Sequence, residues 1–186
     1  MIKKIALSVV TVIVLTTVNA QDAVFGVKSG INIANSCNSN TNSRISFHLG
    51  ATVEFSISDK LSLQPELVYS AQGAKNSDFT INTDFINVPV MVKYYVIDNL
   101  SIEVGPQIGF LIKSEAKSEN STLIRNSKNL FKSVDYGFNI GAGYKLVSGL
   151  NFALRYNMGF SNIYDLENSD AEWKNRVFQV SVGYTF

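Results

Sequence analysis

Apolar and polar residues alternate along most of the chain after residue 20. In the clearest segment, residues 45–57, every odd position is apolar and every even position is small, polar or charged. A repeat of two residues fits a β-strand with two different faces and does not fit the 3.6-residue repeat of a helix. The alternation returns in segments 86–96, 100–112, 134–146 and 150–160, and more weakly in 24–34, 61–73 and 176–186. The pattern therefore predicts eight β-strands.

The connections between these segments alternate in length. Three are tight turns that each contain Asp, Asn, Ser or Gly, at 58–60, 97–99 and 147–149. The other four are long and polar, at 35–44, 74–84, 113–133 and 161–175. Short turns on one rim and long loops on the other are typical of an outer-membrane barrel, whose tilted strands need about 9 to 11 residues to cross the hydrocarbon layer. We therefore expect an all-β fold, an eight-stranded antiparallel up-and-down transmembrane β-barrel.

Alternation alone also fits a soluble lipocalin-like ligand carrier, in which the apolar face of each strand is turned inward. The polar face here is rich in Gly, Ser, Asn, Gln and Thr, whereas a water-facing exterior normally carries many more Lys and Glu. Aromatic residues on the apolar face gather near the two ends of the strands, as two lipid–water interfaces select. They are Phe25, Phe55, Tyr94, Tyr144, Tyr184 and Phe186 at the short-turn end, and Phe47, Tyr69, Phe110, Tyr136 and Phe160 at the long-loop end. We therefore expect the apolar face to contact outer-membrane lipid.

The two ends of the chain carry targeting features. Lys3 and Lys4 precede an apolar run over 5–18 that is too short to span a membrane, and Ala20 ends a plausible cleavage site. We expect a signal peptide over 1–20, a barrel domain over 21–186, and export to the outer membrane of a Gram-negative bacterium. At the other end, the motif Gly183, Tyr184 and Phe186 resembles the signal that the barrel assembly machinery reads during biogenesis.

Composition removes several classes of function. One Cys and one His exclude a disulfide framework, a zinc finger and a His-rich metal site. The 16 basic and 15 acidic residues leave no excess for an electrostatic nucleic-acid binder. His48 is the sole His and no Asp-x-His motif is present, so we interpret it as a hydrogen-bonded residue of the barrel interior. We expect no enzyme activity, no cofactor and no metal.

The polar face places nine ionisable residues inside the predicted barrel. They are Lys28, His48, Glu54, Glu66, Lys93, Glu103, Asp135, Lys145 and Arg155. An eight-stranded barrel is only wide enough for its own side chains, and buried charges must pair or become neutral. We therefore predict an internal network of salt bridges and hydrogen bonds. A turn at 97–99 in which Val96 faces Leu100 would place Lys93 directly opposite Glu103.

All three prolines, Pro65, Pro89 and Pro106, fall inside predicted strands. Proline cannot donate a hydrogen bond to a neighbouring strand. We expect bulges or locally missing hydrogen bonds at these positions. A bulge would also change which of the following residues face the lumen.

Two of the long loops carry opposite charge. Residues 113–132 contain five bases and two acids, whereas residues 161–175 contain four acids and one base. The alternatives are solvated charge without a role, docking of the two loops over the mouth, or a surface with both signs for a partner. The candidate contact residues are Lys117, Arg125, Lys128, Asp165, Glu167 and Trp173.

Four stretches, GVKSGINIA, LQPELVYSAQGA, INVPVMVKYYV and NRVFQVSVGYTF, resemble the outer-membrane β-barrel family labelled porin-family or PorT-like, of the small eight-stranded OmpX/OmpA-like type. The likeness covers nearly all of residues 21–186. It implies a membrane barrel of mostly unknown activity, and some relatives are linked to assembly of a secretion system. We expect a monomer with a structural or surface-binding role through its loops and an unknown loop partner. The alternatives are a narrow pore, a secretion-associated protein or a soluble ligand carrier.

Overall fold

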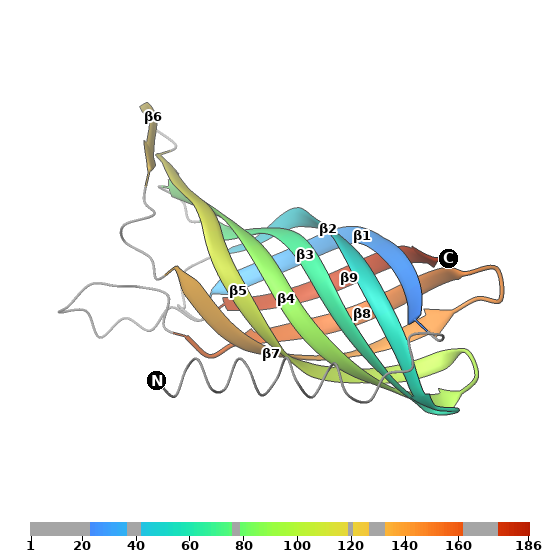
Figure 1. Cartoon of the computed structure of the whole chain (residues 1–186). Coiled ribbons are helices and arrows are strands. Elements are labelled where there is room, and N and C mark those ends of the chain that lie inside the picture. Colours follow the sequence, from blue (N-terminus) through green and yellow to red (C-terminus); the bar gives the residue numbers. More distant parts are fainter. Residues whose placement is uncertain (1–22, 37–41, 76–78, 119–120, 127–132, 162–174) are drawn as a thin grey trace, which may run out of the picture.

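The computed structural model describes residues 23–36, 42–75, 79–118, 121–126, 133–161 and 175–186. Its strands are β1 (Ala23–Ser36), β2 (Asn42–Ser58), β3 (Leu61–Lys75), β4 (Phe79–Ile97), β5 (Leu100–Ser118), β6 (Ser121–Asn126), β7 (Val134–Lys145), β8 (Leu150–Gly159) and β9 (Asn175–Thr185). All strands except β6 form a ring of antiparallel pairs that closes between β1 and β9 (Figure 1). The predicted eight-stranded barrel is therefore confirmed. In the part of the chain that the structure describes, no helix is long and apolar enough to cross a membrane.

The apolar face of each strand points outward and the polar face points into the barrel. In β9, buried and exposed residues alternate from Asn175 to Tyr184. Large apolar side chains such as Ile45, Phe47 and Leu49 of β2 are more than half exposed, whereas His48 between them is 1% exposed. This arrangement excludes the lipocalin-like alternative, in which the apolar face would enclose a cavity. Closure of the ring also leaves no sheet edge unpaired within the barrel wall, as lipid requires.

The prolines do not interrupt the register of the strands. Pro65 lies opposite Val90, and the β3–β4 ladder resumes in the same register at Val68 after a gap of two pairs. Pro106 continues the β5–β7 ladder opposite Phe138. Of the two outcomes expected at the prolines, bulges or missing hydrogen bonds, the structure therefore shows missing pairs beside Pro65 and Pro89 and no bulge at any of the three prolines. A missing donor removes a hydrogen bond without adding a residue, so inward and outward positions stay unchanged.

The register shifts of the β4–β5 pair lie at other positions than the prolines. In the β4–β5 hairpin, Ile97 pairs with Leu100, so the predicted pairing of Val96 with Leu100 is wrong. The shift lies between Tyr95 and the turn, and Lys93 further along the strand still pairs with Glu103.

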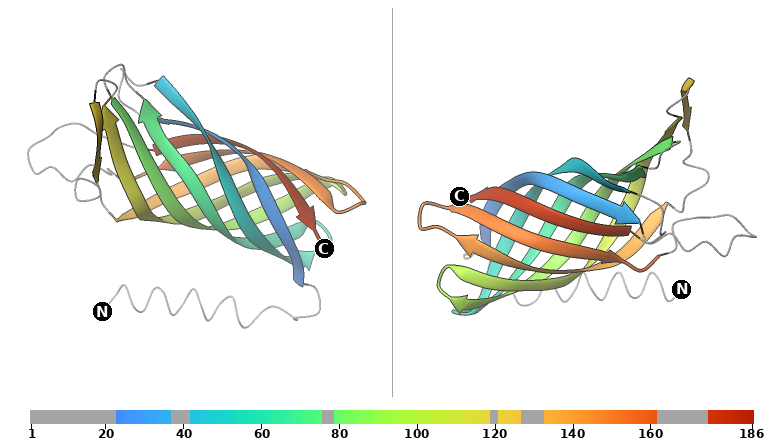
Figure 2. Two further views of the ribbon diagram at one scale, coloured as in Figure 1. Left: turned by 90° about the horizontal axis from the view of Figure 1, so that it is seen from above. Right: turned by 180° about the vertical axis from the view of Figure 1, so that it is seen from behind.

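Strands β4 and β5 extend well beyond the predicted segments, into what the sequence indicated as loops. A second register shift leaves Ile112 without a partner between the pairs Phe85–Leu111 and Asp84–Lys113, and pairing then continues as far as Phe79 and Ser118. Strand β6 adds to the end of β5. The result is a ribbon of strands that stands above the barrel rim on the long-loop side (Figures 1 and 2).

Candidate functional site

The interior of the barrel contains a network of charged side chains, and glycine makes room for its central residue. Strand pairing places Arg155 of β8 opposite Gly141 of β7, and Gly141 opposite Glu103 of β5. Because Gly141 has no side chain, Arg155 reaches across β7, and its Nη2 lies 2.9 Å from Glu103 Oε2. A Cβ atom at position 141 would lie 2.4 Å from the backbone oxygen of Leu154. Glycine is therefore required here by a close approach between two strands.

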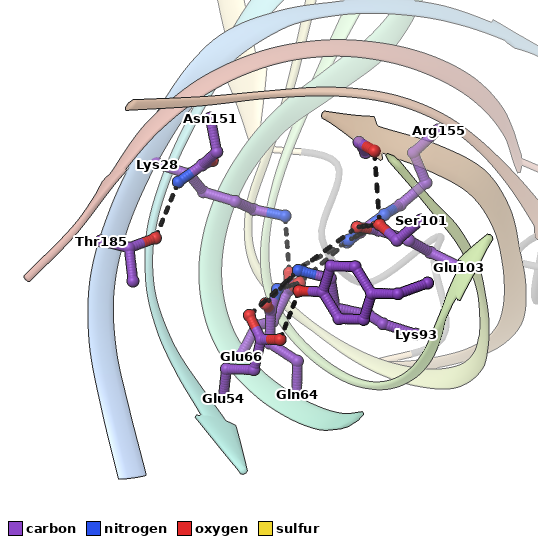
Figure 3. A network of polar contacts seen from close by, with 12 residues as sticks. Lys28, Glu54, Gln64, Glu66, Lys93, Ser101, Glu103, Asn151, Arg155 and Thr185 are labelled. Atoms are coloured by element: carbon purple, nitrogen blue, oxygen red, sulfur yellow. Dashed lines mark hydrogen bonds and ion pairs between the residues drawn. The ribbon is translucent and has the colours of Figure 1, made fainter. Parts of the chain in front are cut away.

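Arg155 also spans the lumen to the opposite wall. In the ring, β8 is four strands away from β3 in either direction, so these two strands face each other across the barrel. Arg155 Nη1 and Nη2 donate to the two carboxylate oxygens of Glu66 on β3, each at 2.9 Å (Figure 3). Two parallel hydrogen bonds between a guanidinium and a carboxylate are among the stronger polar contacts in proteins. They link the two walls through the centre of the lumen.

The remaining charges extend this contact into a continuous chain. Lys28 Nζ lies 2.6 Å from Glu66 Oε2. Lys93 Nζ lies 3.1 Å from Glu54 Oε2 and 3.7 Å from Glu103 Oε1. With Arg155, the lumen network therefore comprises three bases and three acids, each less than one-tenth exposed. The network is neutral as a whole, which is the condition under which buried charges are tolerated.

Neutral side chains complete the hydrogen bonding of these carboxylates. Gln64 donates to Glu66 Oε1 at 2.7 Å and accepts from Lys93 Nζ at 3.1 Å. Tyr95 donates its hydroxyl to Glu54 Oε1 at 2.5 Å. A buried network is stabilising only when its members have their hydrogen bonds made, and these neutral partners supply several of them. Arg155 Nε is buried without a hydrogen-bond partner.

His48 lies in a separate, uncharged cluster. Its Nδ1 is 2.8 Å from Asn32 Oδ1, and its Nε2 is 2.8 Å from the Ser181 hydroxyl. Since Asn32 donates its amide to the backbone oxygen of Ala71, its Oδ1 is the acceptor. Nδ1 of His48 therefore carries the hydrogen and Nε2 accepts from Ser181. Sequence reasoning missed Asn32 and Ser181, although the two-residue alternation along β1 and β9 places both on the inward face.

Two of the nine predicted residues lie apart from both clusters. Asp135 Oδ2 accepts from the Asn175 amide at 3.2 Å, and its Oδ1 is buried without a hydrogen-bond partner. Lys145 borders a hollow of about 860 Å³ at the short-turn end, which is also lined by Glu54 and Tyr95. In the described part of the chain, neither Asp135 nor Lys145 lies in an ion pair.

Apolar side chains also enter the lumen, and the sequence analysis did not anticipate them. Phe85 and Leu111 pair across β4 and β5 near the long-loop end and pack together with Ile81. Met91 and Val68 are also buried on the inward face. Phe85 lies two residues before Asn87, so the alternation along β4 places both on the inward face. This signal was not used, because the faces were assigned by their polar or apolar character and Phe85 is apolar. The interior is thus filled by both polar and apolar side chains.

The other predicted residues fall into two groups. Near the C-terminus, Gly183 is buried, whereas Tyr184 and Phe186 are 46% and 76% exposed, with their ring centroids 5.5 Å apart. Among the loop candidates, Lys117 belongs to β5 and Arg125 to β6. The signal peptide over 1–20 and the loop residues Lys128, Asp165, Glu167 and Trp173 lie outside the described residues. Their roles stay predictions.

The described part of the chain contains no group of three or more His, Cys, Asp or Glu side chains placed to hold a metal ion. Its single His has an amide and a hydroxyl as ring partners, and no described carboxylate bonds to it.

Comparisons with known proteins match this architecture. A family model described as "Outer membrane protein beta-barrel domain" matches residues 19–165. The fold is similar to Neisserial surface protein A (NspA), with a TM-score of 0.55 and 12% identity over 88% of this chain and 97% of that chain. It is also similar to Ail, the attachment invasion locus protein of Yersinia pestis, with a TM-score of 0.52 and 12% identity over the same shares of the two chains. No curated protein sequence matches the chain.

Proposed function

This chain belongs to the outer membrane protein beta-barrel domain family, and we propose that it is a monomeric integral protein of the Gram-negative outer membrane with a non-catalytic, structural or surface-binding role. The barrel contacts lipid through its apolar outer face, after export by the signal peptide and insertion by the barrel assembly machinery. The parts that extend from the long-loop rim present the surface for a partner.

The observation that carries this proposal is the contact between Arg155 and Glu66 across the lumen. It joins opposite walls of the barrel across the lumen. An eight-stranded barrel has room for little more than its own side chains, and here they are charged, paired and closely packed. With the interior used to hold the walls together, the connections at the long-loop rim are the part of the barrel that can meet a partner.

A non-catalytic role is supported by the surroundings of His48. A general base needs a substrate within hydrogen-bond reach. His48 is 1% exposed, and both of its ring nitrogens are already bonded to Asn32 and Ser181.

Two measurements on the full chain test this proposal. Membrane fractionation, followed by electrophoresis with and without boiling, should place the protein in the outer membrane and show different migration for the folded and unfolded forms. Planar-bilayer recordings should show no discrete conductance steps. Recovery in a water-soluble fraction without detergent would contradict the membrane role, and regular conductance steps would contradict the sealed lumen.

A narrow pore is the second candidate, and the hollow at the short-turn end favours it. That hollow of about 860 Å³ opens the lumen from one side as far as Glu54 and Tyr95. A pore would require the network beyond Glu54 to open. A Glu66→Gln/Arg155→Met variant that conducts while the unmodified protein does not would show that the contact between these residues is the barrier. The resemblance to secretion-associated relatives adds no further candidate, because no residue identified in this chain carries that role.

A further inference from the structure

Strand β6 presents a sheet edge above the barrel rim. It pairs with β5 alone, with Glu115 opposite Asn126 and Lys117 opposite Ile124. It is the last strand in the order of the sheet, and no described residue pairs with its other side. Figures 1 and 2 show β6 standing clear of the barrel, at the end of the ribbon formed by β4 and β5.

The position of this edge follows from how β5 changes its neighbour. Within the barrel, β7 pairs with β5 as far as Val134 opposite Phe110. Beyond the rim, β6 takes the same side of β5 from Glu115 onward. Inside the barrel the far side of β7 is covered by β8, whereas the corresponding side of β6 has no described partner. A strand left in this state has a row of backbone N–H and C=O groups that an added strand can pair with.

Charge decides which kind of strand fits. The described residues of β6 and of the end of β5 that leads to it carry three bases, Lys113, Lys117 and Arg125, and one acid, Glu115. Pairing of this edge with the β6 edge of a second copy would bring two positively charged strands together and be opposed by repulsion, whereas an acidic segment would be attracted. We propose that the β6 edge binds an extended, acidic segment of a partner protein by strand addition. This inference rests on the proposed surface-binding role and names the class of partner.

The test uses the full chain in lipid nanodiscs and a labelled ten-residue peptide that alternates Glu and Thr. Saturable binding is expected, because the peptide supplies both backbone pairing and negative charge. A peptide with Pro at each Thr position lacks those backbone donors, and a peptide with Lys in place of Glu reverses the charge. Each should bind at least tenfold more weakly. Equal binding of all three peptides would overturn the proposal.

Two protein variants separate the edge from general attraction. Arg125→Gln removes a base from β6 and should weaken binding by about twofold to fivefold, the range for a single ion pair formed in water. Lys60→Gln makes the same charge change in a turn at the opposite rim and should leave binding unchanged. Equal weakening by both variants would contradict binding at β6.

Amide hydrogen exchange gives a readout that does not depend on a variant. Addition of the Glu–Thr peptide should slow exchange within residues 121–126, and binding without that protection would refute strand addition.

A further variant with Asp165, Glu167, Asp170 and Glu172 changed to Asn or Gln prevents the chain's own acidic segment from competing with the peptide. Absence of saturable binding to this variant and to the unmodified protein would reject the proposal. Fractionation and conductance measurements test the membrane role separately, so its failure can be distinguished from a failure of strand addition.

Discussion

Replacing Arg155 with Met should destabilise the barrel strongly, and a second substitution should restore much of the loss. Arg155→Met leaves three carboxylates with two ammonium groups in the lumen network. Removing one member of a buried ion pair typically costs about 3 to 5 kcal/mol, because the remaining charge stays buried without its partner. In the double variant Arg155→Met/Glu103→Gln the charges balance again. The pairs Lys28–Glu66 at 2.6 Å and Lys93–Glu54 at 3.1 Å both remain.

The magnitude of the coupling follows from these contacts. Glu103→Gln alone removes the carboxylate bonded to Arg155 at 2.9 Å, while Arg155 keeps both bonds to Glu66. A hydrogen bond to a charged group contributes about 1.5 to 3 kcal/mol, so this single change should cost that amount. The double variant should be no less stable than Arg155→Met alone. The two effects therefore fall short of additivity by at least about 1.5 to 3 kcal/mol, and by more to the extent that the second substitution restores stability.

The free energy of unfolding can be measured by urea denaturation of the lipid-embedded protein, followed by circular dichroism and by the electrophoretic shift. Lys113 and Glu115 provide the matched control, since their 3.1 Å contact is of similar length but the Lys113 side chain is 57% exposed. The coupling for Lys113→Met and Glu115→Gln should stay below about 1 kcal/mol. Additive effects at Arg155 and Glu103, or equal coupling at the exposed pair, would refute the reasoning from burial and charge balance.

Three further predictions concern single positions in the lumen. Lys93→Ala should be rescued better by Glu54→Gln than by Glu103→Gln in the same denaturation assay, because Lys93 lies closer to Glu54 and the Glu54 change leaves Arg155 fully paired. Equal rescue would contradict this ranking. Gly141→Ala should lower the free energy of unfolding by about 1 to 3 kcal/mol, since the added methyl meets a backbone oxygen of the next strand. An unchanged urea midpoint would contradict this prediction, because it would mean that β7 and β8 can move apart at no cost to admit the methyl group. Asp135→Asn should leave stability unchanged or raise it, because Asp135 lies in no ion pair among the described residues and one of its oxygens has no hydrogen-bond partner. A loss above about 2 kcal/mol would point to a partner for this charge.

Much of the fold could be predicted because each barrel strand separates two different environments. Lipid on one side and packed polar side chains on the other impose a repeat of two residues, which is visible in the local sequence. The extension of β4 and β5 could not be predicted in this way. Residues 113–118 read as a polar loop, and what makes them a strand is pairing with a neighbour already held beside them. The added residue Ile112, at which the register shifts, also leaves no local signal.

The candidate site was likewise only partly predictable from the sequence. Parity indicated that Arg155, Glu66 and His48 would point inward, since the face of a strand is a local property. Their partners were not predictable from spacing. Arg155 and Glu66 are 89 residues apart, and His48 and Ser181 are 133 apart. The sequence also indicated Lys93 and Glu103 as a pair, which a hairpin brings together, while the shorter contact is to Glu54 across β3.

The sequence by itself determined that the chain forms alternating strands joined by short turns on one rim and long connections on the other, with charges on the polar face. Only the tertiary structure decided which charge meets which, because closing the ring turns opposite walls toward each other and the stagger of the strands sets the level of every side chain. Closure brings Arg155 of β8 to Glu66 of β3. The same geometry carries β6 above the rim, where one of its edges has no described partner.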